Sequence, residues 1–511
     1  MRICTSAEMA EIDTRAQQEY GIPGLLLMEN AGQKALATWR RLEEEQGRHL
    51  VESGAAVGTS VQRLVFVAGK GNNGGDALVM ARQAHIDRLG EVTVVPVAAE
   101  LKGKAAEHLE IVKRLGIRVR PWDTDGQSAR DAISCADVVF DGIAGTGIKG
   151  GLRAPLSDIV SVVNESGARV VAVDVPSGIA DDFQRGSPLV EADTTLTMGL
   201  PKRCLYLPAA RPAAGHIRRI ALGFPPELTD SDALSGRLLE TDDVSRLVPA
   251  PRESDYKHRR GVLAVFAGAR GTSGAAVLAA TAAARSTAGM VRVFADEAVY
   301  PVLASQCRSV MVVERGAELP DLEGHTALLV GPGWGRGERR ERDLSTLLEP
   351  SLPGVLDADG INILSGMRAG RRAPGLGGRW VITPHAGELA RLTGRSGSEV
   401  LAGPFDITGE TARELDAVVV LKSHVTIITA PDGRYGVVDG MNRAMGTGGA
   451  GDVLAGIIAG FLSRGLDPFD AACAGTALHD AIGKRYAAER GYFLAEDLLD
   501  GVSEELGKLL S

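Results

Sequence analysis

The chain of 511 residues is long enough for several domains, at about 150 residues per domain. Apolar residues make up 44% of it and charged residues 24%, as in ordinary globular proteins. The formal net charge of −9 argues against a broad surface for nucleic acids or anionic membranes, so we expect small-molecule ligands and neither of these partners.

Two helices are predicted at the start of the chain, over residues 5–42, with a break at residues 21–24. Thr5 followed by Glu8 has the spacing of a capping box, in which each side chain accepts from the other residue's backbone amide. Residues 43–62 are polar and then rich in Gly, Ala and Ser, which predicts a loop.

Predicted strands with glycine-rich loops at their ends follow. The apolar segment 64–68 runs directly into Gly-Lys-Gly-Asn-Asn-Gly-Gly-Asp, and a helix is predicted from Ala77. Strands 137–140 and 169–175 also end in loops that carry Asp, Thr or Ser. Since the carboxyl ends of parallel strands share one edge of a sheet, three such loops predict a ligand site there.

Simpler interpretations of the same residues stay open at this point. A single glycine loop is more often a turn, and Asp76, Asp141 and Asp174 could each be a helix cap. Lys149 and Lys202 are expected to be solvated, although Lys149 lies inside a glycine loop and could contact phosphate.

In combination, these segments resemble the NAD(P)H-hydrate epimerase family. The shared motifs are Leu-Met-Glu-Asn-Ala-Gly, Asn-Asn-Gly-Gly-Asp, the Gly-Thr-Gly loop after Asp141, and Asp-Val-Pro-Ser-Gly from Asp174. The resemblance implies an α/β domain of the Rossmann-like, three-layer αβα type, which we place at residues 1–224. One residue departs from the family pattern: Ala77 replaces a usual glycine, which would narrow the approach of a ligand to the backbone.

The resemblance also implies roles for individual residues. Asp174 would be catalytic. A potassium ion would be bound by Asn73, Asp141 and Ser177. The substrate-binding residues would be Asn72, Asn73, Gly74, Gly75, Asp76, Gly145, Thr146, Gly147, Ile148, Lys149, Gly150, Gly151 and Asp174.

Residues 224–260 are rich in proline and polar residues and have no sustained periodicity. Such segments usually mark a domain boundary, which we place near residues 224–240. The second domain is expected over residues 236–511.

Strands, loops and helices alternate again in the second half. Strands are predicted over residues 261–267, 290–295, 327–330, 354–356, 379–382 and 417–421. Several strand ends again carry polar groups: Asp-Ala-Asp from Asp357, Thr-Pro-His ending at His385, and Lys422. This order predicts a second parallel sheet with a ligand site at one edge.

The most informative stretch of the chain lies between Asn442 and Leu462. Glycine-rich sequence leads into a segment with one apolar helical face, and a glycine loop at a helix N-terminus suits a nucleotide phosphate. Asp452 lies at the junction, where the helix dipole favours the ionised carboxylate, so the sequence predicts a low pKa. A packed helix with a glycine N-terminus and an aspartate cap is the alternative.

These segments together resemble the ADP-dependent NAD(P)H-hydrate dehydratase branch of the ribokinase-like fold. The resemblance implies a ribokinase-like αβα domain in which Asp452 is the catalytic base and Mg²⁺ and ADP take part. The substrate contacts would be Ala275, Gly333, His385 and Asp452. The nucleotide contacts would be Lys422, Ser423, His424, Val425, Thr426 and Gly451. Ser423 replaces a usual glycine, which leaves the nucleotide fit less certain.

Both resemblances together imply a bifunctional enzyme that epimerises hydrated NADH and NADPH and dehydrates the S form with ADP. A ribokinase-like small-molecule kinase fused to a nucleotide-binding module and a nucleotide-sensing protein are the alternatives. Five scattered cysteines without metal-binding spacing suggest reduced thiols, and no apolar run could span a membrane, so we expect a cytoplasmic protein. We also expect a homo-oligomer.

Overall fold

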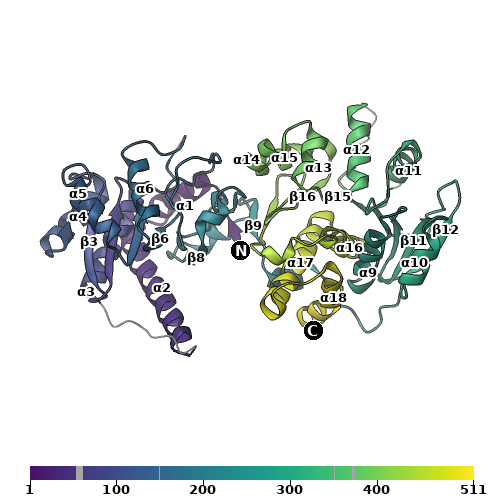
Figure 1. Ribbon diagram of the computed structural model, residues 1–511, viewed down its shortest axis with the longest axis horizontal. Helices are drawn as coiled ribbons and strands as arrows, with labels where there is room; N and C mark the ends of the chain where they lie inside the picture. Colours follow the sequence, from purple (N-terminus) through teal and green to yellow (C-terminus); the bar gives the residue numbers. More distant parts are fainter. Residues whose placement is uncertain (53–60, 149, 350, 371–374) are drawn as a thin grey trace. The chain divides into compact units, whose positions relative to one another are not determined.

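The computed structural model describes residues 1–52, 61–148, 150–349, 351–370 and 375–511. The chain forms two compact units, Arg2–Leu234 and Ser235–Ser511. Met1 belongs to the second unit. Each unit is an α/β domain with helices on both faces of a largely parallel sheet, which confirms the expected fold class (Figure 1).

The sheet of the N-terminal unit has the strand order β4-β3-β2-β5-β6-β7-β8, and every neighbouring pair is parallel. Its strands are β2 (Arg63–Ala68), β3 (Glu91–Pro96), β4 (Arg118–Val119), β5 (Val138–Gly142), β6 (Arg169–Val173), β7 (Thr194–Met198) and β8 (His216–Ile220). From β2 the chain adds strands on one side, up to β4, and from β5 it adds them on the other side, up to β8. Parallel sheets open a crevice for ligands at such a change of direction, which here lies between β2 and β5.

Helices cover both faces of this sheet and bury two apolar clusters against it. They are α1 (Ser6–Gln18), α2 (Gly24–Glu52), α3 (Asn72–Ile86), α4 (Gly103–Arg114), α5 (Gly126–Ser134), α6 (Leu156–Glu165) and α7 (Pro226–Thr229), with the 3₁₀ turns η1 (Arg203–Tyr206) and η2 (Arg211–Ala214). The short strand β1 (Arg2–Ile3) lies outside the sheet.

The predicted capping box is present at the start of α1. The Glu8 amide donates to Thr5 Oγ1 at 3.2 Å, and the Thr5 amide donates to Glu8 Oε2 at 2.6 Å. The loop expected over residues 43–62 is partly wrong, because α2 continues to Glu52; the run Leu-Glu-Glu-Glu-Gln consists of strong helix formers.

The sheet of the C-terminal unit has the order β9-β18-β17-β16-β15-β14-β13-β10-β11-β12. Its strands are β9 (Gly236–Leu238), β10 (Val262–Phe266), β11 (Met290–Asp296), β12 (Met311–Arg315), β13 (Ala327–Val330), β14 (Gly354–Leu356), β15 (Trp380–Ile382), β16 (Val418–Leu421), β17 (Val425–Thr429) and β18 (Tyr435–Asp439). From β16 to β12 all pairs are parallel, whereas β17 is antiparallel to both of its neighbours.

Two apolar clusters lie on the opposite faces of this sheet, one under α9, α16, α17 and α18 and one under α11, α12, α13 and α15. The helices are α8 (Thr241–Leu247), α9 (Ser273–Arg285), α10 (Tyr300–Gln306), α11 (Glu338–Leu348), α12 (Asp359–Ala369), α13 (Ala386–Thr393), α14 (Gly397–Ala402), α15 (Pro404–Leu415), α16 (Ala450–Ser463), α17 (Pro468–Arg490) and α18 (Ala495–Leu510), with the 3₁₀ turn η3 (Arg443–Met445).

The closest helix packing in this unit joins α9 to α16. A Cβ atom added at Gly456 would lie 2.1 Å from the carbonyl oxygen of Ala279, so only glycine lets the two backbones approach this closely. This packing fixes the position of the glycine loop that precedes α16.

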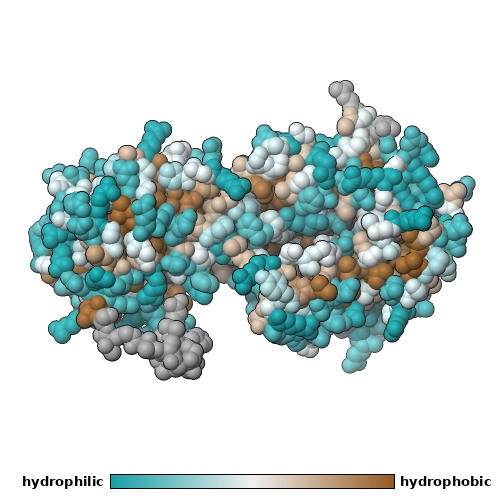
Figure 2. Space-filling model, viewed as in Figure 1, coloured by the Kyte–Doolittle hydropathy of each residue, from teal (hydrophilic) through white to brown (hydrophobic). Residues whose placement is uncertain are grey.

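Hydrophilic side chains cover most of the face shown in Figure 2. Among the described residues, no helix combines the length and apolar character needed to cross a bilayer.

Candidate active sites

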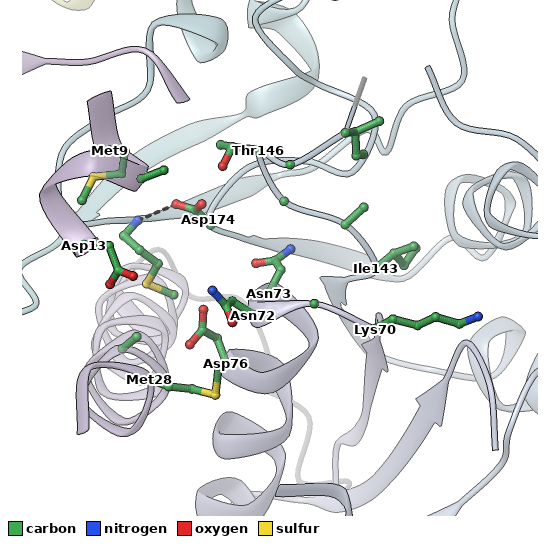
Figure 3. A pocket seen from close by; sticks show the side chains of 18 of the residues that line it. Met9, Asp13, Met28, Lys70, Asn72, Asn73, Asp76, Ile143, Thr146 and Asp174 are labelled. Carbon is green, nitrogen blue, oxygen red and sulfur yellow. Dashed lines mark hydrogen bonds between the residues drawn. The ribbon is translucent and has the colours of Figure 1, made fainter. Parts of the chain in front are cut away.

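A cavity of about 1050 Å³ opens beside the carboxyl ends of β2, β5 and β6 in the N-terminal unit (Figure 3). These strands are adjacent and parallel, so the loops that follow them meet at one edge. The predicted substrate-binding residues that line the cavity are Asn72, Asn73, Asp76, Gly145, Thr146, Gly147, Ile148, Gly151 and Asp174. Lys149 lies outside the described residues, and the Gly150 amide donates to Asp182 Oδ2 at 3.2 Å.

The glycine segment after β2 is already helical, contrary to the expected start at Ala77. Helix α3 begins at Asn72, with Gly71 as its N-cap. Gly74 is required because an added Cβ would lie 2.0 Å from the carbonyl oxygen of Gly69, and at Gly75 it would meet Met28 Sδ at 2.5 Å. The first amides of a helix lack intrahelical acceptors, so this end of α3 offers N–H donors beside the cavity.

Ala77 does not narrow the ligand's approach. It is buried, and a Cβ added at Gly142 would lie 2.5 Å from Ala77 Cβ, so the methyl group faces strand β5 in the core. The substitution affects the packing between helix and sheet.

Of the three residues expected to bind potassium, Ser177 contacts the buried Asp141 carboxylate directly. Asp141 Oδ1 accepts from Ser177 Oγ at 2.6 Å, and Oδ2 accepts from the Ser177 amide at 2.8 Å. Burial raises the pKa of Asp141 to about 6, against the lowering effect of these hydrogen bonds. Asn73 is buried beside Gly145, and both polar atoms of its side chain lack a hydrogen-bond partner among the described residues.

Asp174 forms an ion pair that the sequence analysis missed. Lys202 was expected to be solvated, but its side chain is only 1% exposed, and Nζ donates to Asp174 Oδ1 and to the Met198 carbonyl oxygen. The Met198 amide also donates to Asp174 Oδ1 at 2.9 Å. The signal was available: Lys202 closely follows β7, which neighbours the strand that ends at Asp174.

Asp76 lies on α3 and has no hydrogen bond or salt bridge from its carboxylate among the described residues. Burial raises its pKa well above the usual range, and the negative charge of Asp174 adds to this effect. Of these two aspartates in the cavity, Asp174 is thus paired with a lysine and Asp76 has no such partner among the described residues.

In the C-terminal unit, Asp357 and Lys422 come together at the carboxyl ends of β14 and β16. Lys422 Nζ donates to Asp357 Oδ1 at 2.7 Å, and so does Thr383 Oγ1 at 2.7 Å. A Cβ added at Gly451 would lie 3.2 Å from Lys422 Nζ, which places the ammonium group at the glycine loop. Burial alone would lower the pKa of Lys422, but Asp357 and nearby carboxylates raise it.

Asp452 is the third residue of α16, and Gly449 caps this helix with φ of 95°. The predicted low pKa is wrong: burial raises the pKa of Asp452 to about 7, Asp357 and Glu388 add to the shift, and Lys422 opposes it. A helix N-terminus typically stabilises an anion by about 0.3–1 kcal/mol, which is less than one pKa unit. Burial beside two other carboxylates therefore has a larger effect on the pKa of Asp452 than the helix N-terminus.

His385 caps α13 through its ring. Nδ1 accepts from the Gly387 amide at 3.0 Å and from the Glu388 amide at 3.3 Å. In the neutral ring the proton is therefore on Nε2, which lies 3.6 Å from Glu388 Oε1. The ring is 56% exposed and so is accessible to a ligand.

Two further predicted substrate contacts, Ala275 and Gly333, lie against each other. A Cβ added at Gly333 would lie 3.1 Å from Ala275 Cβ, and φ at Gly333 is +54°. Thr272 Oγ1 donates to the Gly333 carbonyl oxygen at 2.7 Å. The loop after β13 is thus tied to the N-terminus of α9.

Five of the predicted nucleotide contacts, Lys422 to Thr426, lie in the turn after β16 and the first two residues of β17, and the sixth, Gly451, is the second residue of α16. Ser423 Oγ stays within this turn, where it accepts from the Val425 amide at 3.2 Å and donates to the Val425 carbonyl oxygen. The Val425 side chain is fully buried, so only its backbone can meet a ligand; His424 is exposed.

Two protein-family models match separate parts of the chain. One, described as "YjeF-related protein N-terminus", matches residues 24–204, and the other, described as "NAD(P)H-hydrate dehydratase", matches residues 263–504. The bifunctional NAD(P)H-hydrate repair enzyme of Moorella thermoacetica is 34% identical over 98% of this chain and 96% of that protein. The chain belongs to this family.

Other family members are similar along most of their length. The repair enzyme of Salinibacter ruber is 34% identical, over 98% of this chain and 95% of that protein. The repair enzyme of Escherichia coli is 31% identical, over 85% of this chain and 83% of that protein. Membership of the family confirms the resemblance inferred from the sequence.

Among solved structures, the ADP/ATP-dependent NAD(P)H-hydrate dehydratase from Bacillus subtilis, co-crystallised with ATP and Mg²⁺, is 27% identical. It corresponds to 53% of this chain and 98% of that chain, with a TM-score of 0.48.

Proposed function

We propose that the chain repairs hydrated NADH and NADPH, with an epimerase site in the N-terminal domain and an ADP-dependent dehydratase site in the C-terminal domain. One observation carries this proposal. Each half of the chain is matched by its own family model, and each half has a polar site at the ends of adjacent parallel strands. We place the two activities in residues 1–224 and 236–511, in a cytoplasmic homo-oligomer.

Dehydration needs a way to expel hydroxide, which is a poor leaving group. The terminal phosphoryl group of ADP would pass to the substrate hydroxyl oxygen while Asp452 accepts the proton and AMP leaves. The phosphate ester would then depart as phosphate as the nitrogen lone pair forms a C=N bond, and loss of a proton from the neighbouring carbon would give the C=C bond of NADH or NADPH and return the electron pair to nitrogen. A pKa of about 7 makes Asp452 a stronger base than an ordinary aspartate, and burial keeps it close to the reacting oxygen.

The other residues of the C-terminal site bind and orient. Lys422, held by Asp357, offers an ammonium group beside Gly451 for the phosphates, and the first amides of α16 supply further donors. His385, Ala275 and Gly333 would contact the hydrated nicotinamide, and the turn 422–426 would hold the adenine nucleotide.

The acidic residues around Lys422 fit a magnesium ion. Burial raises the pKa of Asp452, and the negative charges of Asp357 and Glu388 add to the shift, so added positive charge would be favourable. Among the described residues, no group of three His, Cys, Asp or Glu side chains could hold a metal ion by itself. Asp357 and Glu388 would therefore share the ion with the phosphates of the nucleotide, which would supply further oxygen ligands. Bound magnesium would stabilise charge on the transferred phosphoryl group.

The residues around Asp141 fit potassium in the N-terminal domain. Asn73 Oδ1 is a buried oxygen without a partner among the described residues, and a carboxylate and a hydroxyl lie nearby. One carboxylate among neutral oxygens suits a monovalent ion, which would offset the charge of the substrate's phosphates. Asn73, Asp141 and Ser177 would hold it, and Asp174 would act on the substrate.

The test uses chemically prepared hydrate and follows the return of the near-ultraviolet absorbance of reduced nicotinamide, with and without ADP. We expect recovery only with nucleotide, and ADP at least as effective as ATP. A mixture of epimers should be consumed completely, because the N-terminal domain supplies the S form. A stable phosphorylated product would instead indicate a kinase, and binding without turnover would indicate a sensor.

A further inference from the structure

Two of the aspartates that line the N-terminal cavity, Asp76 and Asp174, have contrasting surroundings. Asp174 is held by the buried Lys202 ammonium and by the Met198 amide. Asp76 comes from a different element, α3, and has neither kind of partner among the described residues. In the view of Figure 3, Asp174 lies above Asp76, and both lie to the left of Asn73.

Burial favours the protonated form of Asp76, and it is the largest effect on this carboxyl group. The charges of Asp174 and Asp13 also favour the protonated form, whereas Lys202 and Lys104 oppose it. Of the two aspartates, Asp174 forms the ion pair with Lys202. The cavity thus contains one carboxyl group that burial favours in its neutral form and one that is paired with a lysine.

The chemistry of the substrate calls for such a pair. Water adds to a dihydropyridine ring at the carbon next to nitrogen, because the nitrogen lone pair stabilises positive charge there. The resulting stereocentre carries a hydroxyl group beside nitrogen. Its configuration changes when this hydroxyl leaves from one face and water returns to the other.

We propose that Asp76 and Asp174 act as a two-base pair that exchanges this hydroxyl group between the two faces of the ring. The inference rests on the proposed epimerase function and names its catalytic groups. Lys202 is a positioning residue, because it holds Asp174 and does not itself contact the reacting atoms.

The step is balanced in both directions. Asp76 gives its proton to the hydroxyl group, the C–O bond breaks, and the nitrogen lone pair forms a C=N bond, which leaves one water molecule and an iminium cation. A second water bonds to the carbon from the opposite face, Asp174 accepts its proton, and the C=N electrons return to nitrogen. Exchange with solvent then restores the protons, and the reverse reaction uses the two carboxyls in exchanged roles.

The first experiment uses the whole, unaltered chain without nucleotide, so that dehydration does not compete. Purified R hydrate is incubated in water labelled with oxygen-18, the epimers are separated by chromatography, and their masses are measured against an enzyme-free control. We expect one solvent oxygen to enter with each inversion. Inversion that retains the original oxygen would overturn the proposal, because a ring-opening route keeps the C–O bond.

The second experiment measures epimerisation by Asp76→Asn, Asp76→Glu and Asp131→Asn. Loss of a positioned acid or base should slow Asp76→Asn by on the order of 100- to 10,000-fold in both directions, with partial recovery in Asp76→Glu. Asp131→Asn is the control, because Asp131 lies on α5 in the same domain, is exposed, and accepts from Gln127 Nε2 at 2.8 Å away from the cavity, so it should stay close to the parent rate.

The outcomes separate the inference from the function on which it rests. An unaltered chain that does not interconvert the epimers would refute the epimerase function itself. An active parent with an equally active Asp76→Asn variant would refute only the role of Asp76. If the variant folds poorly, ADP-dependent consumption of the S form reports on the other domain, and the oxygen-18 result still decides the route.

Discussion

Each domain anchors a lysine with an aspartate at the end of a parallel strand. Lys202 pairs with Asp174, and Lys422 pairs with Asp357. A buried lysine without a partner would lose its proton or destabilise the fold, so each aspartate keeps the cation in place. The lysine of each pair reduces the negative charge where an anionic nucleotide must bind.

Asp452→Asn tests the base of the dehydratase. The amide has nearly the same shape but cannot accept the hydroxyl proton, so we expect ADP-dependent turnover to fall by on the order of 100- to 10,000-fold. Nucleotide affinity should change little, as measured by calorimetry. Asp500→Asn is the control, since Asp500 lies at the surface with a side chain that is 68% exposed. Turnover by Asp452→Asn near the parent level would exclude Asp452 as the base.

The pKa of Asp452 leads to a prediction about pH. A general base acts as the carboxylate, and the raised pKa of about 7 means that this form is lost as pH falls below 7. The kcat/KM of dehydration should therefore rise with pH up to about 7 and then level off. The pH profile of the parent chain measures this directly. A profile that stays flat down to about pH 5 would show that the carboxylate is ionised as readily as in water.

At the scale of elements, close contacts through glycine determine where the catalytic loops lie. Gly74 brings α3 against the loop after β2, and Gly456 brings α16 against α9. In both cases the helix that carries a proposed catalytic aspartate is positioned by a contact that a single methyl group would block.

Gly456→Ala should destabilise the C-terminal domain. The added Cβ would overlap backbone at 2.1 Å, and overpacking of this kind typically costs about 1–3 kcal/mol. Gly507→Ala on α18 is the matched control, because an added Cβ meets nothing within 4 Å, and alanine favours helix. Denaturant unfolding should show a lower midpoint for the first variant only. Equal midpoints would mean that α9 moves away without cost.

The sequence predicted most strands and their loops because apolar runs followed by glycine are local signals. It also predicted which residues meet at each strand edge, since that follows from parallel topology. It did not predict the Lys202–Asp174 pair or the pKa of Asp452, because both depend on burial and on neighbours distant in sequence. The start of α3 was missed because its first turn contains two asparagines and two glycines, which normally indicate a loop.

At the scale of the whole molecule, the two units divide between Leu234 and Ser235. Residues after 224 still belong to the N-terminal unit, where Leu228 and Leu234 pack into an apolar cluster with Ile12, Ala16 and Leu200. Each leucine that loses this environment costs about 1.5–3 kcal/mol.

Fragments of the chain test whether the two activities are separable. We expect residues 1–234 to fold and interconvert the epimers, residues 235–511 to consume only the S form, and residues 1–224 to melt at a lower temperature than 1–234. Thermal unfolding and the two activity assays measure these outcomes. If 1–224 is as stable as 1–234, the cluster around Leu228 contributes little; if no fragment folds, the domains are not independent.

The backbone of Asp174 limits which residues evolution or engineering can place there. Its φ of 68° lies in the left-handed region, which asparagine, aspartate and glycine tolerate but branched residues do not. Asparagine would keep this backbone conformation and leave the buried Lys202 without its carboxylate partner, whereas valine would do the same and also strain the chain between β6 and Ser177. In a library of all substitutions at this position, sorted for folded protein, Gly and Asn should therefore be retained more often than Val and Ile, whatever their effect on catalysis.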